Sequence, residues 1–165
     1  MGLLSILSCC SKISGNKDDY LTIPKTEYTG NQLRTDGYYY EKWDNKIYSI
    51  SFFYNNGVFL DIGGRQEENE VDNYISIVAK DKLPQGFWGA FLSTGNKITI
   101  EKFVGSDKGY EVYRYEGEII NEDSFILRES SRIKQGQKTD TRDINRTYYF
   151  RAFSPKPDST NNFIK

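Results

Sequence analysis

The sequence of 165 residues contains no histidine. Without an imidazole it cannot form a Ser-His-Asp or Cys-His catalytic pair, a histidine-ligated metal site or a histidine pH switch. Its only cysteines, Cys9 and Cys10, are adjacent and stand near the start. The rest of the chain therefore carries neither a disulfide nor a cysteine-based zinc site. We expect no metal, no cofactor and no catalytic activity.

An excess of either charge is also missing, since 22 lysines and arginines face 23 aspartates and glutamates. A nucleic-acid binder needs a basic surface to offset phosphate charge, so the composition excludes nucleic acid as a partner. No apolar run approaches the ~20 residues that a membrane-spanning helix requires. Aromatic residues, by contrast, make up 15% of the chain, which favours one folded domain with a core over a disordered chain.

The N-terminus has an apolar stretch at residues 3–8, Leu-Leu-Ser-Ile-Leu-Ser, directly before Cys9 and Cys10. This order is typical of the end of a bacterial lipoprotein signal peptide, which leads to acylation of a cysteine. We therefore predict a signal remnant and lipidation site at residues 1–10, with Cys9 slightly favoured over Cys10. The prediction implies a cell-envelope lipoprotein, held at the outer membrane or its periplasmic face by an N-terminal acyl anchor such as palmitate.

Two alternatives stay open for this segment. It could be an unmodified apolar terminus, or a eukaryotic site for myristoylation with palmitoylation. Met1 and Gly2 fit that second pattern, but Ile6 stands where serine or threonine is expected.

Residues 11–33 are polar and keep no period of 2 or 3.6, which predicts a flexible tether. Residues 34–154 would then form the folded domain. Residues 155–165, in which Pro155 and Pro157 stop the last strand, would form a loose C-terminal tail.

Segments rich in β-branched and aromatic residues alternate with turn residues along the domain. They predict eight strands, at residues 37–43, 47–54, 58–62, 87–93, 97–103, 110–120, 124–130 and 147–153. Helical spacing over 71–83 predicts one short helix between the third and fourth strands, either a cover for the barrel or a mobile lid. The charged residues 132–145 predict a long loop.

Eight successive antiparallel strands are best satisfied by closing on themselves, because closure removes the exposed edges. The sequence thus predicts a mainly β fold, an up-and-down antiparallel barrel of about eight strands. Such a barrel is filled by its side chains or holds one small ligand. Charges such as Glu41, Asp61 and Glu101 at alternating strand positions argue against a barrel that spans a membrane, whose outward face must be apolar.

Several short pieces of the sequence carry a resemblance. They are LRTDGYYY at 33–40, WG at 88–89, GNKITIEK at 95–102, YEGEI at 115–119, TYYF at 147–150 and FSPKPDS at 153–159. In combination they resemble uncharacterised Gram-negative lipoproteins with a lipocalin-like domain, over about residues 33–160. The resemblance implies a lipid-anchored, lipocalin-like barrel and no known activity.

A barrel lined by aromatic residues would bind a small amphipathic or hydrophobic ligand by burying its apolar surface, at roughly 25 cal/mol per Å². The candidate ligand-binding residues are Tyr38, Tyr40, Phe52, Trp88, Phe91, Tyr113, Arg114, Tyr149 and Arg151. Alternatively, these side chains fill the barrel, which would be a structural or protein-interaction module at the cell envelope. In both cases we expect a monomer.

Arg151 follows Tyr149 by two residues on the last predicted strand, so both side chains share a face. An inward pair would hold a carboxylate or phosphate head group, whereas an outward Arg151 or Arg114 would pair with surface glutamates. The last strand carries aromatic residues on both faces, so the sequence leaves this orientation open.

Residues 158–160 (Asp-Ser-Thr) resemble an O-glycosylation sequon of some Gram-negative bacteria, which makes Ser159 a candidate acceptor. Residues 145–147 match the N-glycosylation pattern, which would matter only in a eukaryotic secretory route.

Overall fold

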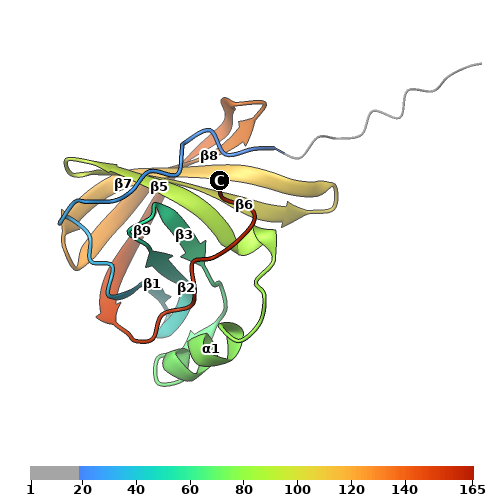
Figure 1. The fold of residues 1–165 in the computed structure, drawn as a ribbon. Helices are drawn as coiled ribbons and strands as arrows, with labels where there is room; N and C mark the ends of the chain where they lie inside the picture. The colour runs from blue at the N-terminus through green and yellow to red at the C-terminus, as the bar shows by residue number, and fades with distance from the viewer. Residues whose placement is uncertain (1–18) are drawn as a thin grey trace, which may run out of the picture.

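The computed structural model describes residues 19–165, and Figure 1 shows their arrangement. The lipidation site predicted at Cys9 and Cys10, and residues 11–18 of the predicted tether, lie outside the described residues. Within residues 19–165, no helix is long and apolar enough to cross a membrane.

Eight antiparallel strands form a closed barrel (Figure 1). They are β1 (Gly37–Trp43), β2 (Lys46–Phe53), β3 (Val58–Asp61), β5 (Trp88–Thr94), β6 (Lys97–Ser106), β7 (Gly109–Asn121), β8 (Ser124–Lys134) and β9 (Gln137–Ala152). Their order is β1-β9-β8-β7-β6-β5-β3-β2, and pairing of β1 with β2 closes the ring. The predicted fold class is therefore confirmed.

Three short elements lie between β3 and β5: the strand β4 (Gln66–Glu67), the helix α1 (Val71–Val78) and the 3-10 turn η1 (Gln85–Phe87). β4 pairs only with the start of β2. The helix follows the third barrel strand, as predicted, with β4 intervening. Its residues Val71 and Ile75 are buried against the barrel strands.

Tight turns join neighbouring strands where the sequence offers residues that tolerate a positive φ. Asp44 and Asn45 have φ values of 48° and 59° between β1 and β2, as a type I′ hairpin turn requires. Gly57 has φ of 80° in the Asn-Asn-Gly turn before β3, and asparagine followed by glycine is a strong hairpin signal. These local signals fix the first two hairpins.

The long loop predicted at residues 132–145 is wrong. Strand β8 continues to Lys134 and β9 begins at Gln137, so only Gln135 and Gly136 turn the chain. This hairpin projects beyond the barrel (Figure 1), and many of its side chains are exposed. Residues 137–145 of β9 include no buried side chain, so this part of the strand shows no apolar alternation, which is the signal that strand prediction depends on.

Alternate side chains along the strands form an inner and an outer apolar cluster. The rings of Phe53 on β2 and Phe125 on β8 lie 5.6 Å apart, although β1 and β9 separate these strands in the sheet. Neighbouring strands lie about 4.8 Å apart, so this contact must cross the barrel interior. The inner cluster comprises Leu33, Tyr39, Phe53, Phe59, Phe91, Ile98, Ile100, Ile119, Phe125, Leu127 and Tyr148.

The outer cluster lies outside the ring of strands and is covered by other parts of the chain. Its barrel residues include Tyr38, Ile50, Phe52, Leu60, Trp88 and Phe103. Helix α1, the N-terminal residues Leu21 and Ile23, and the C-terminal Ile164 pack on it. Each face of these strands is therefore buried, which explains why a strand such as β3 is apolar on both sides, with Phe59 inside and Val58 and Leu60 outside.

Residues 19–33 do not form a free tether, so this part of the prediction is wrong. The segment crosses the outer side of the barrel (Figure 1), and Leu33 is buried in the inner cluster. Tyr28 donates a backbone hydrogen bond of 2.7 Å to Asn55. The polar composition of this segment did not predict that it packs on the barrel, because its hydrogen bonds are made to residues far away in the sequence.

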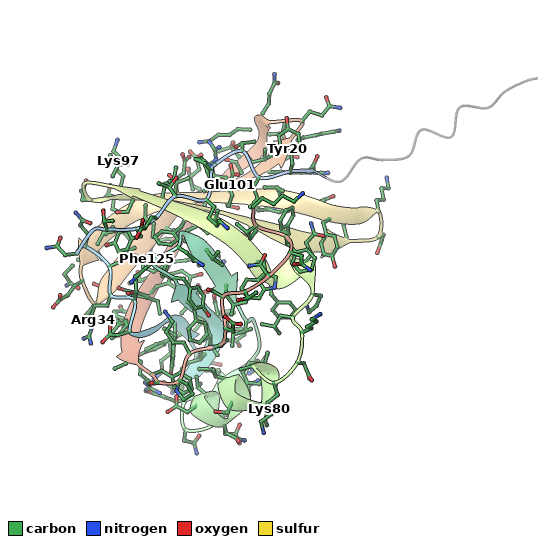
Figure 2. The ribbon with its side chains drawn as sticks, viewed as in Figure 1. Tyr20, Arg34, Lys80, Lys97, Glu101 and Phe125 are labelled. Carbon is green, nitrogen blue, oxygen red and sulfur yellow. The ribbon has the colours of Figure 1, made fainter. Side chains whose placement is uncertain are left out.

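The buried Glu101 on β6 holds this N-terminal segment (Figure 2). Its carboxylate accepts hydrogen bonds from the Thr22 and Ile23 amides at 2.6 and 3.1 Å, and from the Thr22 hydroxyl at 2.7 Å. Arg114 on β7 donates to the same carboxylate through Nε at 2.8 Å and Nη2 at 2.6 Å. A fully buried charge is tolerated only with such a complete set of partners.

The C-terminal residues also pack on the barrel, in contrast to the predicted loose tail. Tyr54 donates from its hydroxyl to the carbonyl of the buried Pro157 at 2.8 Å. The Lys156 ammonium donates to the carbonyls of Thr35 and Phe53. Burial lowers the pKa of Lys156 to about 8, and nearby Asp36 only partly opposes this.

Replacement of Glu101 by glutamine should lower the free energy of unfolding by about 3 kcal/mol, because the Arg114 charge then loses its buried partner. Urea unfolding of the full chain measures this change. Glu118→Gln, at an exposed position of the neighbouring strand, is the matched control and should stay within about 0.5 kcal/mol of the wild type. Equal effects of the two substitutions would contradict the role assigned to Glu101.

Candidate functional site

The barrel interior has an aromatic half and a charged half. Phe53 lies at the centre of the aromatic half, with ring centroids 4.8 Å from Phe91 and 5.2 Å from Phe59. Phe125 stacks on Tyr148 at 4.7 Å and contacts Tyr39 at 5.2 Å. These rings come from six different strands and fill this half of the barrel.

Two ion pairs occupy the other half of the interior. Arg146 on β9 donates through Nε to both carboxylate oxygens of Glu41 on β1, at 2.8 and 2.9 Å, and through Nη2 to one of them. The two strands are neighbours in the sheet. This two-pronged geometry suits the planar guanidinium, and the hydrogen bonds to Glu41 raise the pKa of Arg146 above its ordinary value.

The second pair joins Lys102 on β6 to Asp61 on β3, with β5 between the two strands. Gly89 on β5 stands opposite Lys102, and a Cβ there would come within 2.9 Å of the Lys102 Cβ. Because Gly89 has no side chain, the Lys102 side chain can pass over it and reach Asp61. Ser49 donates a further hydrogen bond of 2.9 Å to Asp61.

Burial and charge act in opposite directions on the ionisable groups of this half. Burial opposes the charged form of Lys102, but the Asp61 carboxylate outweighs it, so the pKa of Lys102 is raised. Burial raises the pKa of Tyr148, and the nearby Arg146 offsets this only in part. At neutral pH the tyrosine is therefore a neutral hydroxyl beside two paired cations.

A small cavity remains between the two halves. It is lined by Phe59, Asp61, Ile100, Lys102, Tyr115, Leu127, Arg146 and Tyr148, and its volume is about 20 Å³. A single water needs roughly 10–15 Å³ measured in this way, whereas pockets for small molecules measure roughly 300–1,000 Å³. The cavity admits one or two water-sized groups.

Most of the predicted ligand-binding residues lie on the outside of the barrel. Tyr38, Phe52 and Trp88 belong to the outer cluster, under α1 and the terminal segments. Of the predicted liners, Phe91 is in the inner cluster, and Tyr113 stands opposite Lys102 on the inward side. The interpretation that these residues share one lining is therefore wrong, because closure assigned them to opposite faces.

The predicted pair of Tyr149 and Arg151 also faces outward. Tyr149 is 49% exposed, and its ring lies 6.2 Å from that of Tyr40 on β1. Arg151 donates to Glu68 at 2.7 Å and to the Tyr38 hydroxyl at 3.3 Å. The outward orientation, with a glutamate partner, is thus the one observed.

Two further predicted site residues, Arg114 and Ser159, form hydrogen bonds with other residues of the domain. Arg114 points outward and binds the buried Glu101 rather than a surface glutamate. Ser159 is part-buried, and its hydroxyl accepts a hydrogen bond of 3.2 Å from Asn56.

Sequence reasoning missed the interior pair of Arg146 and Tyr148. These residues follow the same spacing as Tyr149 and Arg151, an arginine two positions from a tyrosine on one strand. One face of the strand includes Tyr148 and Phe150, and the other includes Tyr149 and Phe153. The alternation of side chains along this strand did not indicate which face points inward, because other apolar residues cover both sides of the sheet.

A scan against protein-family models, a search of curated proteins and a search of solved structures each gave no match.

Replacement of Asp61 by asparagine should lower the free energy of unfolding by about 3 kcal/mol at pH 7, since Lys102 is left without its counter-charge. Asp61 raises the folded-state pKa of Lys102, so its stabilisation is present below the ordinary lysine pKa of about 10.4. It is lost as the pH rises through the raised folded-state pKa. The difference between wild type and variant should therefore shrink at alkaline pH.

Chemical unfolding between pH 7 and 11 measures this dependence. The matched control is Glu67→Gln, which removes an exposed carboxylate that pairs with Lys46 and should cost at most about 1 kcal/mol. A difference between wild type and Asp61→Asn that stays constant up to pH 11 would show that the Asp61 charge does not act through Lys102.

Proposed function

We propose that this chain is a non-catalytic, lipid-anchored barrel of the bacterial cell envelope that acts as a structural or protein-interaction module. The observation that carries the proposal is the filled interior, where rings and ion pairs leave a cavity of about 20 Å³. A carrier that buries an amphipathic ligand in its barrel needs a pocket of several hundred Å³. The filled barrel therefore has the better support of the two functions that the sequence left open.

The outer surface offers residues that suit a protein partner. Trp43 at the end of β1 is 73% exposed, and its ring lies 5.8 Å from that of Tyr48. The Arg65 guanidinium lies 5.9 Å from the centre of the Tyr48 ring. Tryptophan, tyrosine and arginine are the residue types that dominate binding energy at protein interfaces. An exposed cluster of these three types supports recognition through the surface.

The docked N-terminal segment supports a role close to a membrane. Thr22 is fixed to the barrel by Glu101, and it stands twelve positions after Cys10. At most about 3.3–3.6 Å per residue, an acyl group on Cys10 would keep the barrel within roughly 40 Å of the bilayer. The chain between the acylated cysteine and Thr22 would thus hold the surface of the barrel at the envelope, where its partners would be found.

Native mass spectrometry of the full chain, purified gently from a Gram-negative host, tests the filled barrel. We expect no bound mass that disappears on denaturation, because the interior has no space for one. A co-purifying molecule of several hundred daltons that is lost on denaturation would overturn the proposal in favour of a ligand carrier.

A cavity-enlarging variant provides the control. Leu127 lines the cavity, and Leu127→Ala should cost about 2–5 kcal/mol and open space for a small apolar molecule. Benzene should therefore raise the thermal unfolding temperature of Leu127→Ala and leave that of the wild type unchanged. Stabilisation of both proteins by benzene would show that the wild-type interior is already open.

Metabolic labelling with a palmitate analogue tests the anchor. The wild type should incorporate the label and partition with membranes, and the double variant Cys9→Ser/Cys10→Ser should do neither. The single variants identify the acylated cysteine. Membrane partitioning by the double variant, or an unlabelled wild type, would contradict the anchor.

A further inference from the structure

The cavity inside the barrel presents hydrogen-bond donors that the barrel itself does not use. Arg146 gives Nε and Nη2 to Glu41, but its Nη1 makes no hydrogen bond within residues 19–165. The Tyr115 hydroxyl likewise makes none with the residues that the structure describes. Lys102 has three N–H groups and gives one to Asp61. All three donors line the same cavity.

The acceptors of this cluster are already engaged. Both carboxylate oxygens of Glu41 accept from Arg146, and the two oxygens of Asp61 accept from Ser49 and Lys102. The free N–H and O–H groups of the cavity can therefore donate to an acceptor that is not part of the barrel, either water or an oxygen of another molecule.

Charge balance restricts the kind of acceptor. Two cations face two anions; Lys102 and Asp61 are 19% and 11% exposed, whereas the Arg146 side chain is 35% exposed and its partner Glu41 18%. An added anion would leave one negative charge without a partner, which is costly in such surroundings. An uncharged oxygen satisfies the donors without this cost.

Size and shape restrict it further. The cavity of about 20 Å³ admits one or two water-sized groups. Part of its wall is apolar and formed by the buried side chains of Phe59, Ile100 and Leu127. A carbonyl or hydroxyl group attached to carbon fits both features, while the rest of its carrier stays outside.

We propose that the cavity is a binding site for a carbonyl or hydroxyl oxygen, which projects from a partner molecule and accepts hydrogen bonds from Arg146 and Tyr115. The inference rests on the proposed function, because only a filled barrel leaves these donors around so small a space.

NMR titration of the full chain tests this site, with Cys9→Ser/Cys10→Ser in place to prevent acylation. The probes are N-methylacetamide for a carbonyl, methanol for a hydroxyl and acetate for an anion. We expect at least one neutral probe to produce saturable shifts at the Arg146 side-chain N–H, and acetate to bind about tenfold more weakly because of the charge balance.

Two tyrosine variants on one strand provide the matched comparison. Tyr115→Phe should weaken binding about fivefold, the loss expected for one neutral hydrogen bond. Tyr113→Phe should leave it unchanged, since that hydroxyl donates to Glu111 instead. Neither substitution removes an ion pair, so both variants should fold.

Each other outcome overturns the inference. Tighter binding of acetate would make the cavity an anion site, and the absence of shifts with every probe would make it a water site only. Equal effects of Tyr115→Phe and Tyr113→Phe would place the binding elsewhere. These results would leave the filled barrel intact, whereas a co-purifying ligand in native mass spectrometry would remove the basis of both proposals.

Discussion

The rings of Phe53 and Phe125 meet across the barrel, and much of the structure depends on this contact. Phe91 and Tyr39 pack against the same rings, so aromatic side chains occupy the full width of the interior. Because the rings come from strands far apart in the sheet, their contact requires closure of the barrel. It also decides which residues face outward, since every second side chain on a strand must point away from the rings.

The other half of the interior contains charged side chains. Ion pairs take the place of rings there, and charges removed from water are stable only when each has a close partner. Glu41 with Arg146, and Asp61 with Lys102, meet that condition while leaving several N–H groups free. The polar half is thus balanced in charge, yet still able to give hydrogen bonds.

Burial of the outer face links the barrel to both ends of the described chain. The helix α1 and the terminal segments cover the outer apolar cluster, and the buried Glu101 fixes the N-terminal segment through Thr22. This segment therefore cannot move freely from the barrel without exposing a charge and apolar surface. Under the proposed acyl anchor, such docking would limit the distance between barrel and membrane.

Local chemistry determined most of the fold. Segments rich in aromatic and β-branched residues and the helical spacing from Val71 act over a few residues, and the sequence alone predicted the elements that they form. The start of β9 was not predicted as a strand, because residues 137–145 include no buried side chain that would give an apolar alternation. Only closure of the barrel decided that Tyr148 and Arg146 face inward while Tyr149 faces out. The reason is physical: a strand with apolar cover on both sides has no preferred face until its neighbours in space are in place.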